Sequence, residues 1–270
     1  MPPARAVQRP LKTVAAQTPQ GFPSCGTSVA KILASMKTDP NTDRGSVERL
    51  YLQRNSRRLV DRIRRALEPP GPFIMNPREN IVAPLGRWNL YIGGGGCIVD
   101  GYINLDLFGL PGVNVVADAT HLPFPDAIFQ RIECDAVLEH VRLPEIVMKE
   151  IERVLQPGGF AHVVTPFCHP FHECPKDYRR FTPEGLESMG GNLRVVAKGW
   201  RTGPTATILV FLLEYLKLML PWRWWRILAH GVFGWLLFPF RYLDLLLLKS
   251  PQAGRIGNHC YIWFQKAERK

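Results

Sequence analysis

Short runs of β-branched and aromatic residues alternate along the chain with amphipathic helical patterns. A helical pattern begins at about Pro144 and is expected to end at a Pro157-Gly158-Gly159 turn. Strands are expected at 88–92, 102–107, 113–117, 129–134, 160–165 and 194–199, and a last alternating run covers 260–266. Strands that alternate with helices predict an α/β fold with a parallel sheet whose faces are covered.

Residues 205–249 break this alternation with a dense apolar stretch that holds four of the chain's seven tryptophans. The longest uncharged run, 227–240, is shorter than the roughly 20 residues that a membrane-spanning helix needs. Basic residues are interleaved with the apolar ones, which suits helices that lie in a membrane interface; a lid or dimer surface is the alternative. We expect an apolar helical insertion before the last strand.

The N-terminal part differs in composition from the rest. Residues 1–43 contain no acidic residue before Asp39, which predicts a disordered basic tail, although such a start also resembles a transit peptide. Ser46 to Leu67 predict a basic amphipathic helix that packs on the main domain or docks on an anionic surface. The expected divisions are a tail (1–43), a basic helix and linker (44–83), a core (84–204), the apolar insertion (205–255), and a last strand with a short tail (256–270).

Composition narrows the class of protein. The 270 residues carry 34 Lys and Arg against 23 Asp and Glu, a formal charge of +11 that favours anionic partners. The six cysteines show no regular spacing, and no signal-peptide core precedes them, so a reducing cytosol is expected.

Four consecutive glycines, Gly93–Gly96, follow the first expected strand. Without β-carbons the backbone can approach a ligand closely, and Asp106 at the end of the second strand can accept hydrogen bonds from ribose hydroxyls. The dinucleotide fingerprint needs a third glycine or alanine where Ile98 stands, so this pattern disfavours NAD.

The stretches VVADATHLPFPDAIFQRIECDAVLEHV and EIERVLQPGGFAHVVTP resemble the class I S-adenosylmethionine-dependent methyltransferases, in particular the type 11 branch related to quinone-biosynthesis methyltransferases. The resemblance covers about 88–200, with 260–266 as the last strand. It implies a Rossmann-like, mostly parallel sheet with a final antiparallel strand, and S-adenosylmethionine as the cofactor.

The resemblance also implies roles for single residues. Gly93 and Gly95 would lie under the methionine and ribose, and Asp106 would bind the ribose hydroxyls. Asp118 and Ala119 would meet the adenine. The methionyl end would be lined by Cys134, Asp135 and Leu138 and closed by Glu139 and His140.

Three features depart from the family pattern. Tyr91 stands where many relatives have an acidic residue, and Gln130 follows Phe129 where the motif usually has Asp. Only about ten residues join the first two strands, the lower edge of a helical crossover.

The stretch TPFCHPFHECPKDYRRFTPEGL follows the fifth strand, where ligand-binding loops of such a sheet gather. We expect His169 or His172 to act as a general base, and Tyr178, Arg179 and Arg180 to bind the acceptor. The alternative is a hydrogen-bonded loop that only caps the cofactor pocket. The cysteines and histidines of this loop lack the paired spacing of a closed zinc site, so we expect no metal.

These observations predict an S-adenosylmethionine-dependent methyltransferase that acts on an amphipathic or lipid-linked small molecule, by O-methylation, and that lies on the cytoplasmic membrane face. A non-catalytic membrane-associated adaptor with a degenerate fold is the alternative. No nucleic acid partner is expected, because the chain lacks an Asn/Asp-Pro-Pro-Tyr motif and the apolar insertion suits lipid better than a phosphate backbone.

Overall fold

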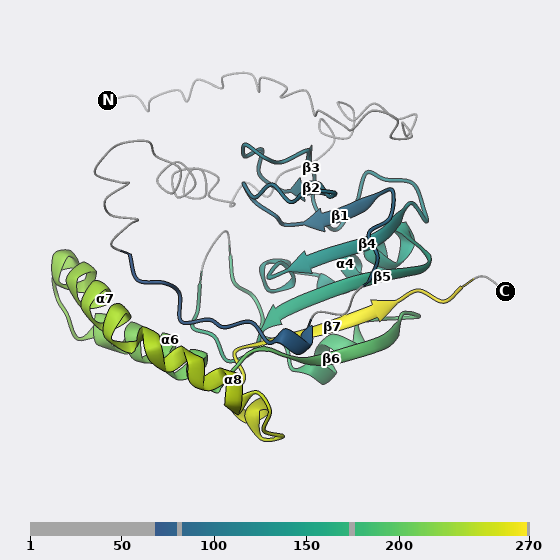
Figure 1. The fold of residues 1–270 in the computed structure, drawn as a ribbon. Helices are drawn as coiled ribbons and strands as arrows, with labels where there is room; N and C mark the ends of the chain where they lie inside the picture. The colour runs from purple at the N-terminus through teal and green to yellow at the C-terminus, as the bar shows by residue number, and fades with distance from the viewer. Residues whose placement is uncertain (1–67, 80–82, 173–175, 269–270) are drawn as a thin grey trace, which may run out of the picture.

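The computed structural model describes residues 68–79, 83–172 and 176–268 (Figure 1). The expected tail at 1–43 and the expected basic helix at 46–67 lie outside these residues. So do Glu173 and Cys174 of the acceptor loop.

Seven strands form one sheet in the order β3-β2-β1-β4-β5-β7-β6. Every neighbouring pair is parallel except those made by β7, which is antiparallel to both β5 and β6. The strands are β1 (Asn89–Ile92), β2 (Ile103–Asp106), β3 (Val115–Val116), β4 (Phe129–Asp135), β5 (Leu155–Pro166), β6 (Arg194–Thr202) and β7 (His259–Gln265). The expected mostly parallel sheet with a final antiparallel strand is confirmed.

One local expectation was wrong. Helix α4 (Pro144–Val154) ends before the Pro157-Gly158-Gly159 sequence, which lies inside β5. Leu155 already pairs with Phe129, and the register then shifts so that Arg131 pairs with Phe160; the Pro-Gly-Gly sequence takes up the extra residues. Gly158, with φ of +77°, supplies the left-handed conformation that this irregularity needs. The chain between β1 and β2 has turns in place of a crossover helix.

The apolar core lies between the sheet and two helices on one face. Helix α4 buries Val147, Met148, Ile151 and Val154, which recur at helical spacing on one side. Helix α5 (Pro183–Ser188) begins at Thr182, whose hydroxyl accepts from the Gly185 N–H, and it buries Leu186. On the opposite face the segment around η1 (Pro77–Glu79) is bonded to β7, where the Trp263 indole donates to the Glu79 carbonyl at 2.8 Å.

A helical segment, residues 204–256, joins β6 to β7. It comprises α6 (Pro204–Leu218), α7 (Arg223–Leu237), η3 (Phe238–Leu243), α8 (Asp244–Leu247) and η4 (Ala253–Ile256). In Figure 1 these helices lie beside the β6 side of the sheet. Among the described residues, no helix has the length and apolar character needed to cross a membrane.

Strand direction decides which loops meet. Because β6 and β5 are both antiparallel to β7, they run the same way, and their carboxyl ends lie at the same edge as those of β1, β2 and β4. The residues after β4 therefore lie at this edge, together with the loop after β5 and the start of α6. We call it the ligand edge. Ligands of open α/β sheets bind at this edge.

Candidate functional site

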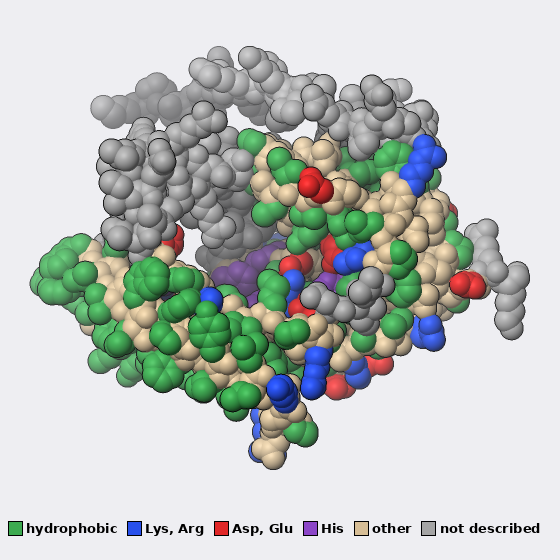
Figure 2. Space-filling model, viewed as in Figure 1, with side chains coloured by type: hydrophobic (Ala, Val, Ile, Leu, Met, Phe, Trp, Pro, Cys, Tyr) green, Lys and Arg blue, Asp and Glu red, His purple; other side chains and the backbone are tan. Residues whose placement is uncertain are grey.

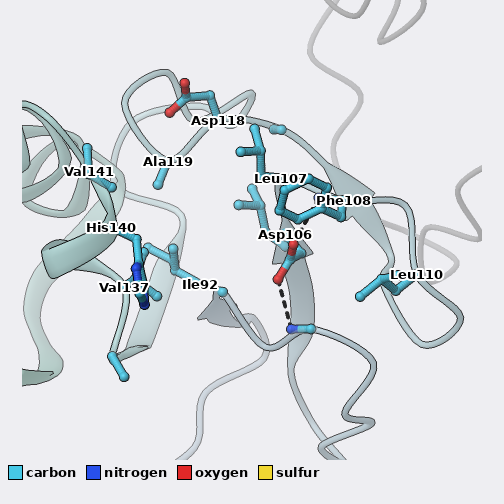
Figure 3. Close-up of a pocket in the computed structure, with 15 residues that line it drawn as sticks. Ile92, Asp106, Leu107, Phe108, Leu110, Asp118, Ala119, Val137, His140 and Val141 are labelled. Carbon is cyan, nitrogen blue, oxygen red and sulfur yellow. Dashed lines mark hydrogen bonds between the residues drawn. The ribbon is translucent and has the colours of Figure 1, made fainter. Parts of the chain in front are cut away.

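A cavity of about 230 Å³ lies at the ligand edge, beside the carboxyl ends of β1, β2 and β4 (Figure 3). Its walls are mostly apolar, with two half-buried carboxylates, Asp106 and Asp118, and the Gly93 and Gly95 backbone. The side chains labelled in Figure 3 converge on it from the ends of β1 and β2 and from the segments after β2, β3 and β4: Ile92, Asp106, Leu107, Phe108, Leu110, Asp118, Ala119, Val137, His140 and Val141.

The glycine loop is shaped for close approach. Gly93 has φ of +74°, and a β-carbon there would lie 2.2 Å from a methyl of Val137. Gly95 has φ of +55°, and a β-carbon there would meet nothing within 4 Å, which agrees with its place on the cavity wall. The loop is held from below by Asn104, whose amide donates to the carbonyls of Gly95, Cys97 and Gly112 at 2.8 to 3.1 Å.

Asp106 is held in place by two backbone donors. One carboxylate oxygen accepts from the Gly95 N–H and the other from the Phe108 N–H, each at 2.9 Å. Burial raises the pKa of Asp106, and the backbone hydrogen bonds oppose that rise. Each oxygen can accept a further hydrogen bond from a ligand hydroxyl.

Five of the eight predicted cofactor residues line this cavity: Gly93, Gly95, Asp106, Asp118 and Ala119. The structure does not bring the other three to it. Cys134 of β4 and Leu138 of η2 (Leu138–His140) are fully buried in the core cluster, together with the buried side chains of α4. Asp135 points to the opposite face, where it pairs with Arg201 at 2.6 Å. The backbone turn there presents Ala136, Val137 and His140 to the cavity instead.

Tyr91 also faces away from the cavity. It lines a second, polar cavity of about 470 Å³ on the opposite face, together with Asp135, Arg201 and Glu133. Burial raises the pKa of Tyr91, and the Asp135 charge adds to that rise. The departure from the family pattern at Tyr91 therefore changes this second cavity and leaves the wall of the first one unaltered.

The loop after β5 folds back on the residues after β4. The Tyr178 N–H donates to the Glu139 carbonyl at 2.8 Å. The Arg180 guanidinium donates to the Asp177 carboxylate and to the Pro170 carbonyl. The Arg180 hydrogen bonds outweigh the effect of burial and lower the pKa of Asp177. Arg180 therefore positions the loop.

The other two predicted acceptor residues have protein partners as well. Arg179 pairs with Glu145 of α4 at 2.8 Å, and the Tyr178 hydroxyl accepts from Arg142 at 3.2 Å. These contacts agree with the alternative of a hydrogen-bonded capping loop, since they hold the loop against α4.

Four histidines gather beside the cavity. Ring centroids lie 5.0 Å apart for His140 and His172, 4.9 Å for His172 and His169, and 5.2 Å for His169 and His259. Figure 2 shows histidine side chains in the hollow between the helical segment and the sheet. Burial lowers the pKa of His140 and of His169, and it lowers that of His259 to about 3. The rings of His140, His169 and His259 are therefore neutral imidazoles at pH 7.

Glu139 lies beside this histidine cluster, near His140 and His172. From the sequence, Glu139 is predicted only to close the methionyl end of the cofactor site. Its side chain is fully buried, and burial raises its pKa to about 8. Glu139 follows β4 and His172 follows β5, so the two residues are far apart in the sequence. No sequence spacing predicts that they lie close together.

Residues 106–163 match the model of a methyltransferase domain. Many solved structures resemble the chain. They include the [4+2]-cyclase SpnF (16% identity, 77% of this chain and 82% of that one, TM-score 0.47), a putative sarcosine dimethylglycine methyltransferase from Galdieria sulphuraria (14%, 85% and 99%, 0.45), and a Burkholderia thailandensis 1,6-didemethyltoxoflavin-N1-methyltransferase (13%, 67% and 71%, 0.41). No curated protein matches the chain.

The strand order, with β7 antiparallel between β5 and β6, is that of the class I methyltransferase fold. Together with the methyltransferase-domain match over residues 106–163, it identifies a class I S-adenosylmethionine-dependent methyltransferase domain in this chain. The comparisons do not make an apolar insertion evident at residues 204–256.

The cavity fits the cofactor. Gly93 and Gly95 leave backbone open where a side chain would intrude, Asp106 offers carboxylate oxygens for ribose hydroxyls, and apolar side chains from Leu107 to Val141 can cover an adenine ring.

Proposed function

We propose that this methyltransferase transfers a methyl group to a hydroxyl of an amphipathic or lipid-linked small molecule. One observation carries the proposal: the cofactor cavity, the histidine cluster and the start of the apolar helical segment all lie at the ligand edge. An acceptor with a polar reacting end and an apolar remainder would find a matching surface for each part.

Bound S-adenosylmethionine would supply a methyl group on a sulfonium, which is reactive without further activation. The protein's contribution is to hold the acceptor in line and to keep water out. Val137, Val141 and Phe108 form the apolar wall that supports the second task.

A hydroxyl acceptor must lose a proton, and we propose that His169 or His172 takes it. The Nδ1 of His169 lies 2.9 Å from the Pro170 carbonyl, so the tautomer that donates there leaves Nε2 as an acceptor. Tyr178, Arg179 and Arg180 are proposed to bound the acceptor's path. Arg180 would act through the loop conformation, because its guanidinium is committed to Asp177.

We further propose that the helical segment rests on the cytoplasmic face of a membrane. Its outer surface exposes Trp222, Trp224, Trp225 and Trp235 among many aliphatic side chains, and Figure 2 shows apolar side chains collected over it. The segment carries six basic residues against two acidic ones. Tryptophans beside basic residues suit the headgroup region of an anionic bilayer.

The test is calorimetric titration with S-adenosylhomocysteine of the wild-type protein, of Asp106→Ala, and of Asp100→Ala as a control at an exposed aspartate. We expect the wild type and the control to bind alike, and Asp106→Ala to bind at least about tenfold more weakly, as loss of charged hydrogen bonds implies. A folded wild type that does not bind would favour the non-catalytic adaptor. Equal binding by all three would refute the role of Asp106.

A further inference from the structure

Glu139 is a buried acid whose carboxylate has no hydrogen-bond partner in the described part of the chain. Its side chain is fully inaccessible, and neither carboxylate oxygen has a hydrogen-bond partner among the described residues. A buried polar group without a partner is costly, and native proteins keep such groups where a ligand or ion completes them.

Two imidazole nitrogens face the same carboxylate oxygen. The Nε2 atoms of His140 and His172 lie 3.8 Å and 3.9 Å from the Glu139 Oε1. The three candidate ligand atoms all lie within 4.8 Å of one another. Ligand atoms at about 2.1 Å from a tetrahedral ion are roughly 3.4 Å apart, so modest side-chain rotations would close the set around one ion.

We propose that Glu139, His140 and His172 bind a divalent transition-metal ion, with Zn²⁺ as the best match. Two imidazoles and one carboxylate are the protein ligands of open, catalytic zinc sites, in which a fourth position is left for water or substrate. Hard cations such as Mg²⁺ and Ca²⁺ prefer oxygen ligands and fit this set poorly.

The surrounding hydrogen bonds orient both imidazoles for this role. His140 Nδ1 lies 2.5 Å from the Lys176 carbonyl, so it donates there and leaves Nε2 free to bind a metal. His172 Nδ1 lies 3.4 Å from the Pro170 carbonyl and 3.5 Å from an Asp177 oxygen, and Arg180 holds Asp177 in place. A carbonyl or carboxylate behind each ligating histidine is the usual support of a metal site.

The loop after β5 would then be fastened to the residues after β4 at two places, by the ion and by the Tyr178–Glu139 backbone bond. His140 also lines the cofactor cavity, so the ion would stand next to the transferred methyl group. Resting on the proposed function, this assigns the open coordination position to the acceptor hydroxyl, whose proton the ion would acidify. His169 would remain as the imidazole that takes the proton.

Metal binding can be tested without the acceptor. The untagged full-length protein is stripped with a chelator, dialysed, and titrated with Co²⁺ followed by visible absorption, and with Zn²⁺ in competition with a chromogenic chelator. The variants are Glu139→Gln, His140→Gln and His172→Gln, and His121→Gln is the control at an exposed histidine outside the cluster. Near-ultraviolet circular dichroism and S-adenosylhomocysteine binding report the fold of each variant.

We expect one ion per chain in the wild type and in His121→Gln. Loss of a residue that only supports a metal ligand lowers metal affinity roughly 10- to 100-fold. Each variant that removes a ligand should therefore lower the affinity for the metal by at least this factor. His172→Gln is the variant least exposed to a folding defect, because its side chain is 36% accessible.

Several results would overturn the assignment. They are a folded wild type that takes up no Co²⁺ or Zn²⁺, variants that bind as His121→Gln does, or an intense thiolate-to-cobalt band that places the ion on cysteine. Failure of metal binding with intact S-adenosylhomocysteine binding would reject this site and leave the proposed methyl transfer standing.

Discussion

At Gly93 the backbone passes so close to Val137 that a β-carbon would lie 2.2 Å from a methyl group, whereas at Gly95 it would meet nothing. Both glycines have positive φ, which costs other residues about 1–2 kcal/mol. We therefore predict that Gly95→Ala lowers the free energy of unfolding by about 1 kcal/mol, and that Gly93→Ala lowers it by more and also weakens S-adenosylhomocysteine binding. Urea unfolding and calorimetry check this pair, and equal effects at both positions would contradict the close approach.

His162 lies between two carboxylates, with Nδ1 2.7 Å from Glu133 and Nε2 3.0 Å from Glu79, and its ring stacks on Trp263. Burial opposes protonation, but the two carboxylates outweigh it and raise the pKa of His162. A raised pKa in the folded state stabilises the protein fully below about pH 6.5, the unfolded value, and this contribution is lost as the pH rises through the folded value. We predict that His162→Gln destabilises the protein by about 3 kcal/mol at pH 6 and by less at high pH.

The measurement is the free energy of urea unfolding across pH 6 to 9 for the wild type, His162→Gln and the exposed His121→Gln. Arg131 and Arg201 also face these carboxylates and stay charged throughout the range, so they do not alter the sign. A destabilisation by His162→Gln that is the same at every pH would show that the ring acts only by packing.

At the scale of elements, one carboxylate fixes the start of the helical segment. The two Asp244 oxygens of α8 accept from the Thr205 and Ala206 N–H groups at 2.8 Å and 2.9 Å, which satisfies the free donors at the start of α6. We predict that Asp244→Ala costs about 2 kcal/mol of stability, measured by urea unfolding, because the cap is fully buried. Asp100→Ala should cost almost nothing, and a similar loss in both would refute the capping role.

Local patterns indicated most of the elements, and they failed where distant pairing decided the outcome. The alternating run at 260–266 predicted a strand, and β7 lies there, although its burial is continuous across both faces. Pro157-Gly158-Gly159 looked like a turn, but the pairing of Leu155 with Phe129 starts β5 before it. The Asn104 side chain, which holds the glycine loop, gave no signal because its three partners are carbonyl groups that any sequence has.

At the scale of the whole molecule, the site is assembled by the topology. Asp106 could be predicted because a carboxylate after the second strand has one position in such a sheet. Cys134, Asp135 and Leu138 were misplaced because the turn after β4 offers its backbone and Val137 to the cavity instead. Glu139 and His172 stand 33 positions apart, and only the parallel order of β4 and β5 brings their loops together.

The strand order also places the helical segment beside the site. Its outer surface is proposed to contact a membrane, and this contact can be tested. Trp224 and Trp225 are 56% and 38% exposed on α7. We predict that Trp224→Ser with Trp225→Ser weakens binding to vesicles of mixed neutral and anionic lipid at least about tenfold, since burying such side chains contributes on the order of 2 kcal/mol. Sedimentation with vesicles measures this, and Ile98→Ser, at an equally apolar but distant position that is 81% exposed, should leave binding unchanged.

Higher salt and fully neutral vesicles should weaken wild-type binding, because the segment's excess of basic residues would attract anionic headgroups. If the double variant still binds vesicles, another surface makes the membrane contact. If the wild type does not bind vesicles, the exposed tryptophans instead contact a protein partner or a second copy of the chain.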